Sequence, residues 1–236
     1  TSVYYGGDAT KWAEISIGSY NSSLTSATRY YYSATQPTTT GNYWHYVDGV
    51  PTVWEVSSES NYSVGLEYAI NEDGQSYSVI GMGTCTDTNI IIPNEYEGLP
   101  VTIIGDRAFL FYSNITRVTM GNSVTTIGSD AFGFCPNLTS VTIGNSVTTI
   151  GSAAFSHCSN LTSVIIPDSV ITIGGGAFWT CGLTSVTFIN PNGWWYEDCY
   201  DATIVQVVAV SDLSNSATAA QYLTGIDTRY YWYRAE

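Results

Sequence analysis

Residues 138–151, Leu-Thr-Ser-Val-Thr-Ile-Gly-Asn-Ser-Val-Thr-Thr-Ile-Gly, decide the fold because the chain repeats them. Closely similar segments begin at Ile115 and at Leu161, so each step is 23 residues, and a step of 22 residues leads on to Leu183. A sequence that resembles itself at this period is typical of a solenoid, in which each coil buries its apolar edge only by stacking on neighbouring coils. The chain is therefore predicted to be a solenoid, an architecture that favours a binding scaffold over an enzyme.

Within one coil, Val141 and Ile143 flank Thr142, which predicts a short strand with the two apolar side chains pointing inward. A second inward-facing stretch ends at Ile150, and Gly151 permits the tight corner after it. Phenylalanine and cysteine side chains recur at equivalent positions of successive coils, so they should form continuous columns in the interior. These columns are Phe132, Phe155 and Phe178, and Cys135, Cys158 and Cys181.

The repeats begin before the clearest copies. Residues 90–109 contain a degraded coil with about five extra residues around 94–100, so we expect four coils plus a fifth strand at Leu183. Two hairpins are also expected. One turns at Asp48-Gly49, and the other joins residues 66–70 to residues 77–80.

Two pairs of distant segments resemble one another. Residues 1–5 match residues 184–188, and residues 24–32 match residues 223–232, with Thr-Arg in both. We interpret residues 24–32 and 223–232 as segments that close an array, so the sequence is expected to be a fragment that begins within a repeat strand. The predicted parts are a tail of a preceding array (1–35), a Ser/Thr/Pro- and aromatic-rich connector (36–61), a repeat array with an N-terminal hairpin cap (62–193) and a C-terminal capping segment (194–236).

The pattern L-T-S-V-T-I-P-x-S-V-T-x-I-G-x-x-A-F-x-x-C resembles the BspA-like leucine-rich repeats of bacterial surface proteins. Residues 138–158 match it at every position except Gly144, where the family has Pro, and the resemblance runs from Ile90 to about Phe188. It implies a leucine-rich-repeat solenoid of the BspA type, mainly β with short 3-10 or helical turns. It also implies a non-enzymatic, extracellular or cell-surface role in adhesion to host proteins, matrix or other bacteria.

Composition narrows the classes of partner. Charged residues make up only 11% of the chain, and six Lys and Arg stand against twenty Asp and Glu, giving a net charge of −14. A basic stripe that could neutralise phosphates is missing from the sequence, so we expect neither nucleic acid nor an anionic membrane surface as a partner. No apolar run is long enough to cross a membrane. We expect a monomer without a cofactor.

The five cysteines do not form a recognisable disulfide framework or zinc motif. Because three of them occupy one interior repeat position, we expect reduced structural thiols, although one pair on adjacent coils could oxidise. Cys85 and Cys199 fall near opposite ends of the array and should be too far apart to pair. There is no C-x-x-C segment, and His45 and His157 are isolated, so no metal site is expected.

No catalytic residue is predicted. His157 lies beside Ser156 and Cys158, but a nucleophile–base pair also needs an orienting group and an oxyanion hole from other elements. The acidic groups lack the alternating ligands and central Gly of a calcium loop, so we interpret them as solvated turns. These groups are Glu72 with Asp73, Glu95 with Glu97, and Glu197 with Asp198 and Asp201.

Two surfaces are candidates for ligand binding, and a third possibility is that the chain is only a structural spacer. The first is the strand-ladder face, made of the outward residues of the repeat strands, which could contact a host or bacterial surface protein or matrix. The second is a group of tail aromatics, Trp194, Trp195 and Tyr196, which could bind glycans or support an associated enzyme. We favour for them the role of capping the last coil, because the end of a solenoid must be sealed. The strand-ladder face comprises Thr116, Arg117, Thr119, Thr139, Ser140, Thr142, Thr162, Ser163, Ile165, Thr184, Ser185 and Thr187.

Overall fold

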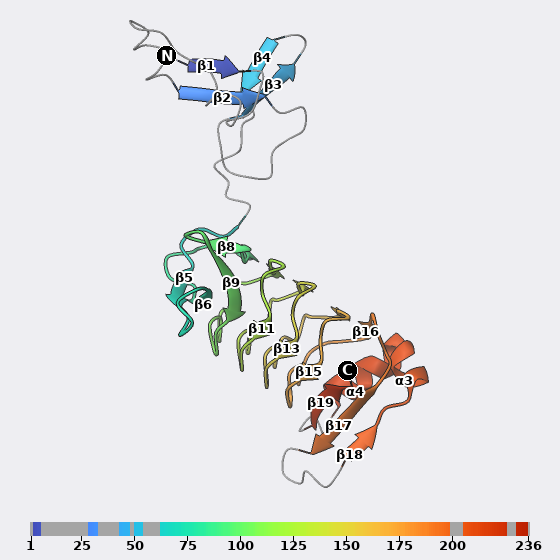
Figure 1. The fold of residues 1–236 in the computed structure, drawn as a ribbon. Coiled ribbons are helices and arrows are strands. Elements are labelled where there is room, and N and C mark those ends of the chain that lie inside the picture. Colours follow the sequence, from blue (N-terminus) through green and yellow to red (C-terminus); the bar gives the residue numbers. More distant parts are fainter. Residues whose placement is uncertain are drawn as a thin grey trace, which may run out of the picture. The chain divides into compact units, whose positions relative to one another are not determined.

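The structure, a computed structural model, describes residues 2–5, 28–32, 43–47, 50–53, 62–198, 205–225 and 230–235 (Figure 1). The chain divides into two units, residues 1–60 and residues 61–236.

The first unit contains a four-stranded sheet in the order β1 (Ser2–Tyr5), β2 (Thr28–Tyr32), β3 (Tyr43–Val47) and β4 (Val50–Val53). Strands β3 and β4 pair antiparallel with Val47 opposite Val50, which confirms the first predicted hairpin. Strand β1 pairs directly with β2. The segments of the second unit that resemble β1 and β2 do not pair with each other, so the likeness between the two tails does not extend to strand pairing.

The second unit begins with the other predicted hairpin, β5 (Glu67–Ile70) and β6 (Tyr77–Gly81), which pair antiparallel. Strand β6 joins a parallel ladder in which Ile104, Ile127, Ile150 and Ile173 occupy equivalent, buried positions. The ladder consists of β9 (Leu99–Ile104), β11 (Thr126–Ile127), β13 (Thr149–Ile150) and β15 (Thr172–Ile173). The short β8 (Glu95–Tyr96) lies beside β9.

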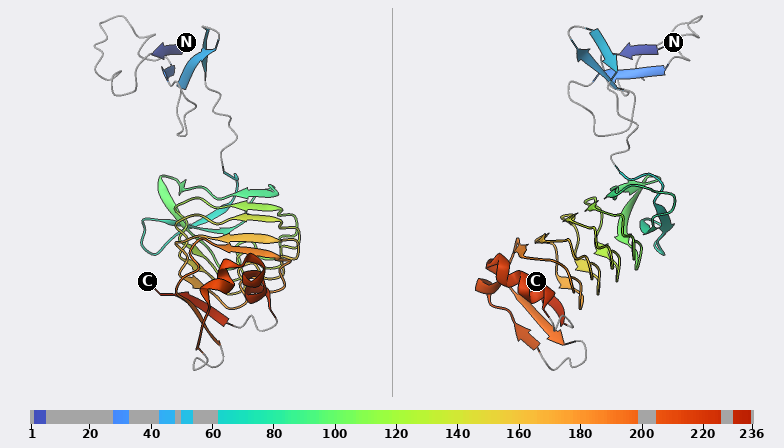
Figure 2. Two further views of the ribbon diagram at one scale, coloured as in Figure 1. Left: turned by 90° about the vertical axis from the view of Figure 1, so that its right-hand side faces the viewer. Right: turned by 180° about the vertical axis from the view of Figure 1, so that it is seen from behind.

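A second ladder forms the opposite side of the solenoid, and Figure 2 shows its strands as successive rungs. Its strands are β7 (Asn89–Ile91), β10 (Arg117–Thr119), β12 (Ser140–Thr142), β14 (Ser163–Ile166) and β16 (Ser185–Phe188). The first three are hydrogen-bonded as one parallel sheet and the last two as another, with β12 and β14 adjacent. The described residues thus form a mainly β solenoid of about five turns, slightly more than the four coils and added strand that the sequence suggested.

The two ladders enclose a continuous apolar core. Phe109, Phe132, Phe155 and Phe178 stack with ring centroids 4.9, 5.3 and 5.3 Å apart and nearly parallel planes, which confirms the predicted aromatic column and extends it by one ring. Successive backbones approach so closely at the corner that a Cβ on Gly151 would lie 2.6 Å from the carbonyl carbon of Gly128. Only glycine fits there, as the sequence predicted for this corner.

The C-terminal segment closes the last coil. Strand β19 (Tyr230–Arg234) pairs antiparallel with β15, and beyond it lie β17 (Trp194–Asp198) and β18 (Val205–Val207). Two helices not predicted from the sequence, α3 (Val210–Ser214) and α4 (Ser216–Thr224), pack against β16. Arg234 pairs with Asp168 of the last coil at 2.9 Å and so anchors β19. Neither α3, α4 nor any other helix of the described residues is long and apolar enough to cross a membrane.

Candidate binding surfaces

The strand ladder of β7 to β16 presents two rows of outward side chains. Because alternate residues of a strand point to opposite faces, Val118, Val164 and Val186 enter the core and the residues on either side of each face outward. Pairing keeps these residues in register: Arg117 lies opposite Ser140, and Ile165 opposite Thr187. We call these the two outward rows. They are Asn89, Arg117, Ser140, Ser163 and Ser185, and Ile91, Thr119, Thr142, Ile165 and Thr187.

The threonines at the start of the repeat strands form hydrogen bonds between successive coils. The hydroxyl of Thr139 donates to the carbonyl oxygen of Thr116 at 2.9 Å, and the hydroxyl of Thr184 donates to that of Thr162 at 3.3 Å. Thr116 bonds in the same way to Thr88 at 3.1 Å. These side chains, which were expected on the binding face, are exposed but use their donor to tie one coil to the next. The two outward rows therefore offer the better ligand contacts.

On β10 to β16 the outward rows are uniform except at two positions, whereas β7 contributes Asn89 and Ile91. Arg117 is exposed, and no acidic side chain among the described residues pairs with it. Ile165 is 58% exposed and lies opposite Thr187 in its row. A ligand could therefore meet one cation and one apolar side chain on a surface that is otherwise mostly hydroxylated. Sequence reasoning missed Asn89 and Ile91, because their coil is degraded and its register with Arg117 and Thr119 is set by pairing.

The tail aromatics do not form one exposed platform. Trp194 is only 1% exposed, its Nε1 donates to the carbonyl oxygen of Asn190 at 3.0 Å, and its ring packs against Phe188. It therefore offers no surface to a ligand, and its packing agrees with the capping role rather than with the alternative of ligand binding. Trp195 lies on the opposite face of β17 and stacks on Tyr233 with ring centroids 4.6 Å apart.

Tyr196 also packs within the cap. Its ring lies 4.5 Å from that of Tyr230 and 5.1 Å from that of Trp232 between centroids. Burial, with a smaller contribution from Tyr230, raises the pKa of the Tyr196 hydroxyl. Of the three tail aromatics, Trp195 is therefore the one whose position best suits contact with a ligand.

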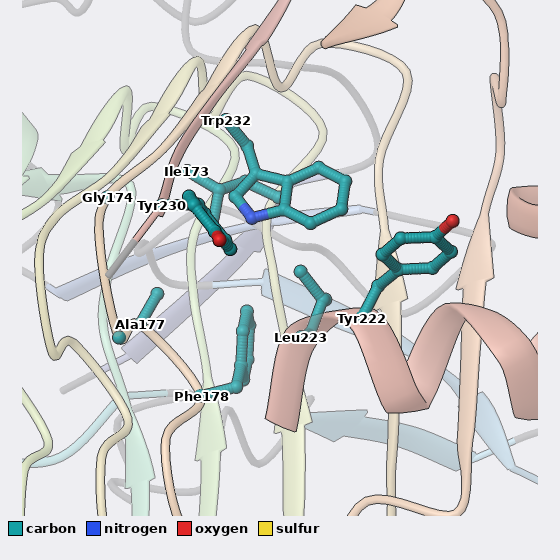
Figure 3. A pocket seen from close by; sticks show the side chains of 9 residues that line it. Ile173, Gly174, Ala177, Phe178, Tyr222, Leu223, Tyr230 and Trp232 are labelled. Atoms are coloured by element: carbon teal, nitrogen blue, oxygen red, sulfur yellow. The ribbon is translucent and has the colours of Figure 1, made fainter. Parts of the chain in front are cut away.

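A small pocket lies between the last coil and the C-terminal segment (Figure 3). Phe178 and Ala177 line it from the coil, Leu223 and Tyr222 from α4, and Trp232 from β19. Its cavity volume of about 10 Å³ is far below the roughly 300–1,000 Å³ of typical small-molecule sites. We therefore interpret the pocket as a packing gap under the cap.

The repeat cysteines form a ladder of thiol hydrogen bonds. Cys135, Cys158 and Cys181 donate to the carbonyl oxygens of Phe109, Phe132 and Phe155 at 3.2, 3.2 and 2.9 Å. All three are free thiols; the first two are fully buried, whereas Cys181 is half-buried at the end of the ladder. Burial raises the pKa of Cys135 to about 12, and a hydrogen bond with Cys181 followed by burial raises the pKa of Cys158. Cys199 lies outside the described residues.

The acidic residues are dispersed in local hydrogen bonds. The Asp73 carboxylate accepts from the backbone N–H groups of Gln75 and Ser76, and the bond with Gln75 is the main reason that its pKa is lowered. Glu97 accepts from the Tyr77 hydroxyl and Glu197 from the Tyr233 hydroxyl, each at 3.0 Å. Within the part of the chain that the structure describes, no three metal-binding side chains come together.

An exposed aromatic row along one edge of the solenoid is the surface feature that sequence reasoning missed. Phe111 and Phe134 have ring centroids 5.0 Å apart, His157 stacks 4.1 Å from Phe134, and Trp179 meets His157 edge-on at 4.9 Å. Phe111 is 65% exposed and Trp179 47%. His157 thus packs between the aromatic rings of its neighbours in this row. The recurrence of aromatic rings at 111, 134 and 157, at the 23-residue step, was the signal that could have revealed the row.

Comparison with known proteins gives a consistent result. A family model described as the BspA type leucine rich repeat region matches residues 82–204 in six copies. Among solved structures, the chain is similar to a leucine-rich repeat protein from Bacteroides capillosus at 29% identity and a TM-score of 0.49, covering 56% of this chain and 100% of that one. A search of curated proteins found no match.

Two further solved structures are similar to parts of this chain. One is a leucine-rich repeat protein from Bacteroides ovatus, at 26% identity and a TM-score of 0.45, covering 53% of this chain and 36% of that chain. The other is a leucine rich cell surface protein from Faecalibacterium prausnitzii, at 25% identity and a TM-score of 0.45, covering 54% of this chain and 33% of that chain. The chain thus spans about a third of the length of each.

Proposed function

This chain belongs to the BspA-type leucine-rich-repeat family, and from that premise we propose that it is a non-enzymatic binding module that presents its strand-ladder face to a protein or matrix ligand outside the cell. Proteins of this type are typically repeat modules without catalytic activity and are typically found at surfaces. The adhesive role and the identity of the ligand class are the proposal.

The observation that carries the proposal is the in-register pair of outward rows on β7 to β16. Parallel strands place equivalent side chains side by side, so short polar groups repeat at a regular spacing across several coils. Such a face suits an extended protein surface better than a small molecule, because the binding sites of small molecules are concave. Since it contains little charge and few large side chains, we expect modest affinity, which several modules on one chain would strengthen.

A glycan-binding role at the C-terminal cap is the alternative. The stacked pair of Trp195 and Tyr233 favours it, because aromatic side chains that remain partly accessible offer apolar contact area beside a polar edge. This alternative predicts binding that depends on Trp195 and does not involve the outward rows.

The test changes the two positions at which the outward rows of β10 to β16 depart from uniformity. Arg117→Ser with Ile165→Thr gives each site the residue of one paired neighbour, Ser140 for position 117 and Thr187 for position 165. Because both side chains are exposed, we expect the unfolding free energy to change by no more than about 0.5 kcal/mol per substitution. Binding to panels of matrix and cell-surface proteins, run beside a glycan array, should weaken.

A matched control carries the same replacements elsewhere. Arg107→Ser with Ile80→Thr changes an exposed Arg and an exposed Ile outside the two outward rows, and it should leave binding unchanged. Equal loss of binding in both double variants would show a nonspecific effect of charge and apolar area. Full retention in the Arg117 and Ile165 variant would reject the proposed face, and loss in Trp195→Ala would then support the cap.

A further inference from the structure

The outermost strand of the capping sheet, β18 (Val205–Val207), leaves one edge unpaired among the described residues. It pairs with β17 alone, on the side away from the solenoid (Figure 1). The N–H of Val208 donates to the carbonyl oxygen of Trp194 at 2.9 Å, so position 208 bonds towards β17. Since this direction alternates along an antiparallel strand, Gln206 also bonds towards β17, whereas the N–H and C=O groups of Val205 and Val207 point outward.

The side chains of this edge strand do nothing to shield it. Natural edge strands are usually protected by Lys, Pro, a bulge or a covering segment. Here Val205 is 52% exposed, Val207 is 83% exposed, and Gln206 between them is neutral. Val207 lies directly opposite Trp195, so the exposed edge continues into the Trp195 and Tyr233 stack on the same face.

The charge around β18 selects the kind of strand that could join it. Residues 194–225 contain no Lys, Arg or His, and Glu197 lies directly opposite Val205. A second copy of a chain with a net charge of −14 would bring two such acidic caps together, which is unfavourable. A basic strand would be attracted instead.

We propose that the free edge of β18 binds an extended basic peptide segment by strand addition. Backbone N–H and C=O groups of Val205 and Val207 would supply the hydrogen bonds, as in other sheets that accept an added strand. Alternate peptide side chains would contact Val207 and Trp195 on one face, while Lys or Arg side chains approach Glu197. This site lies on the cap and is independent of the strand-ladder face.

The probe is a fluorescent peptide in which Val and Thr alternate with Lys. Its binding to the full chain is measured by fluorescence anisotropy. Val207→Pro is the decisive variant, because it removes an outward N–H and leaves the bonds between β17 and β18 in place. Loss of that hydrogen bond, worth about 1.4 kcal/mol, should weaken binding about tenfold. Val207→Thr keeps the N–H and should weaken binding about fourfold or less.

Three controls separate strand addition from other causes. Gln206→Pro removes a donor that bonds to β17, so it should lower the melting temperature, whereas Val207→Pro should not. A peptide N-methylated at alternate residues cannot donate hydrogen bonds along one edge, so it should bind far more weakly to the unchanged protein. This measurement tests strand addition even if the Val207→Pro variant fails to fold. Glu197→Gln should weaken binding mainly at low salt.

Several results would overturn the proposal. Undetectable binding of the basic peptide, equal affinity for a peptide with Glu in place of Lys, or equal affinity for the N-methylated peptide would each reject it. A wild-type dimer that Val207→Pro converts to a monomer, measured by light scattering, would show that a second copy occupies the edge and would reject the basic peptide as its occupant.

Discussion

At the scale of single residues, each coil turns through two positions with left-handed backbone. One set comprises Arg107, Asp130, Ala153 and Gly176, and the other Phe111, Phe134, His157 and Thr180, with φ between 53° and 67°. The sequence predicted the corner at Gly151, because a recurring glycine indicates that two backbone segments approach closely there. It could not predict these positions, because seven of the eight carry residues that disfavour left-handed backbone. The hydrogen bonds between successive coils impose that conformation, such as the bond from the Phe134 N–H to the Ser156 carbonyl oxygen at 2.8 Å.

Thr180 offers a direct test of that strain. It is a β-branched residue at φ 59°, and its side chain is exposed. Left-handed backbone costs a residue with a Cβ roughly 1–2 kcal/mol, whereas glycine adopts it freely but loses more entropy on folding. We expect Thr180→Gly to raise the unfolding free energy by about 0.5–1 kcal/mol in urea titrations. The control Thr187→Gly, in strand β16, should lower it by about the same amount; the opposite pattern would show that position 180 is unstrained.

At the scale of elements, the repeat strands were predictable and the helices of the capping segment were not. Alternation around Val118 and Val141 indicated β10 and β12, because each strand buries one face. Helices α3 and α4 have a weaker signal: Asn215 caps α4 by accepting from the N–H groups of Ala217 and Thr218, but most of the apolar residues of α4 are alanines. Their positions depend on packing against β16, which local sequence does not encode.

The cysteine ladder is an element whose chemistry can be tested by thiol labelling. The thiolate is the reactive form. Burial raises the pKa of Cys135, and the hydrogen bond with Cys181 followed by burial raises the pKa of Cys158, so both thiols stay protonated. We expect Cys181, which is half-buried, to react first in the native protein at pH 8, while the other two react only on unfolding. Mass spectrometry of labelled peptides assigns the sites. Fast native labelling of Cys135 or Cys158 would contradict their inward position.

At the scale of the whole molecule, the sequence predicted the stacked core but did not identify the ligand. A core of equivalent side chains repeats with the period, so the Phe column followed from spacing alone. The binding surface depends on which outward residues remain free of structural hydrogen bonds. Thr139 and Ser140 look equally available in the sequence, yet only Thr139 ties its hydroxyl to the previous coil. Fold and period do not identify a ligand, because a solenoid can present many different surfaces.

The stacked core also determines how residues 61–236 should unfold. Phe155 is fully buried between two rings whose centroids lie 5.3 Å away on either side, so Phe155→Ala should lower the unfolding free energy by about 3–5 kcal/mol. Phe134→Ala, on the neighbouring coil but 41% exposed, should cost no more than about 1.5 kcal/mol. Because each coil is stabilised by its neighbours, labelling of Cys135 in Phe155→Ala should rise in the same urea range as the loss of β-sheet circular dichroism. Labelling of Cys135 well before that loss would mean that the coils unfold separately and that the column does not couple them.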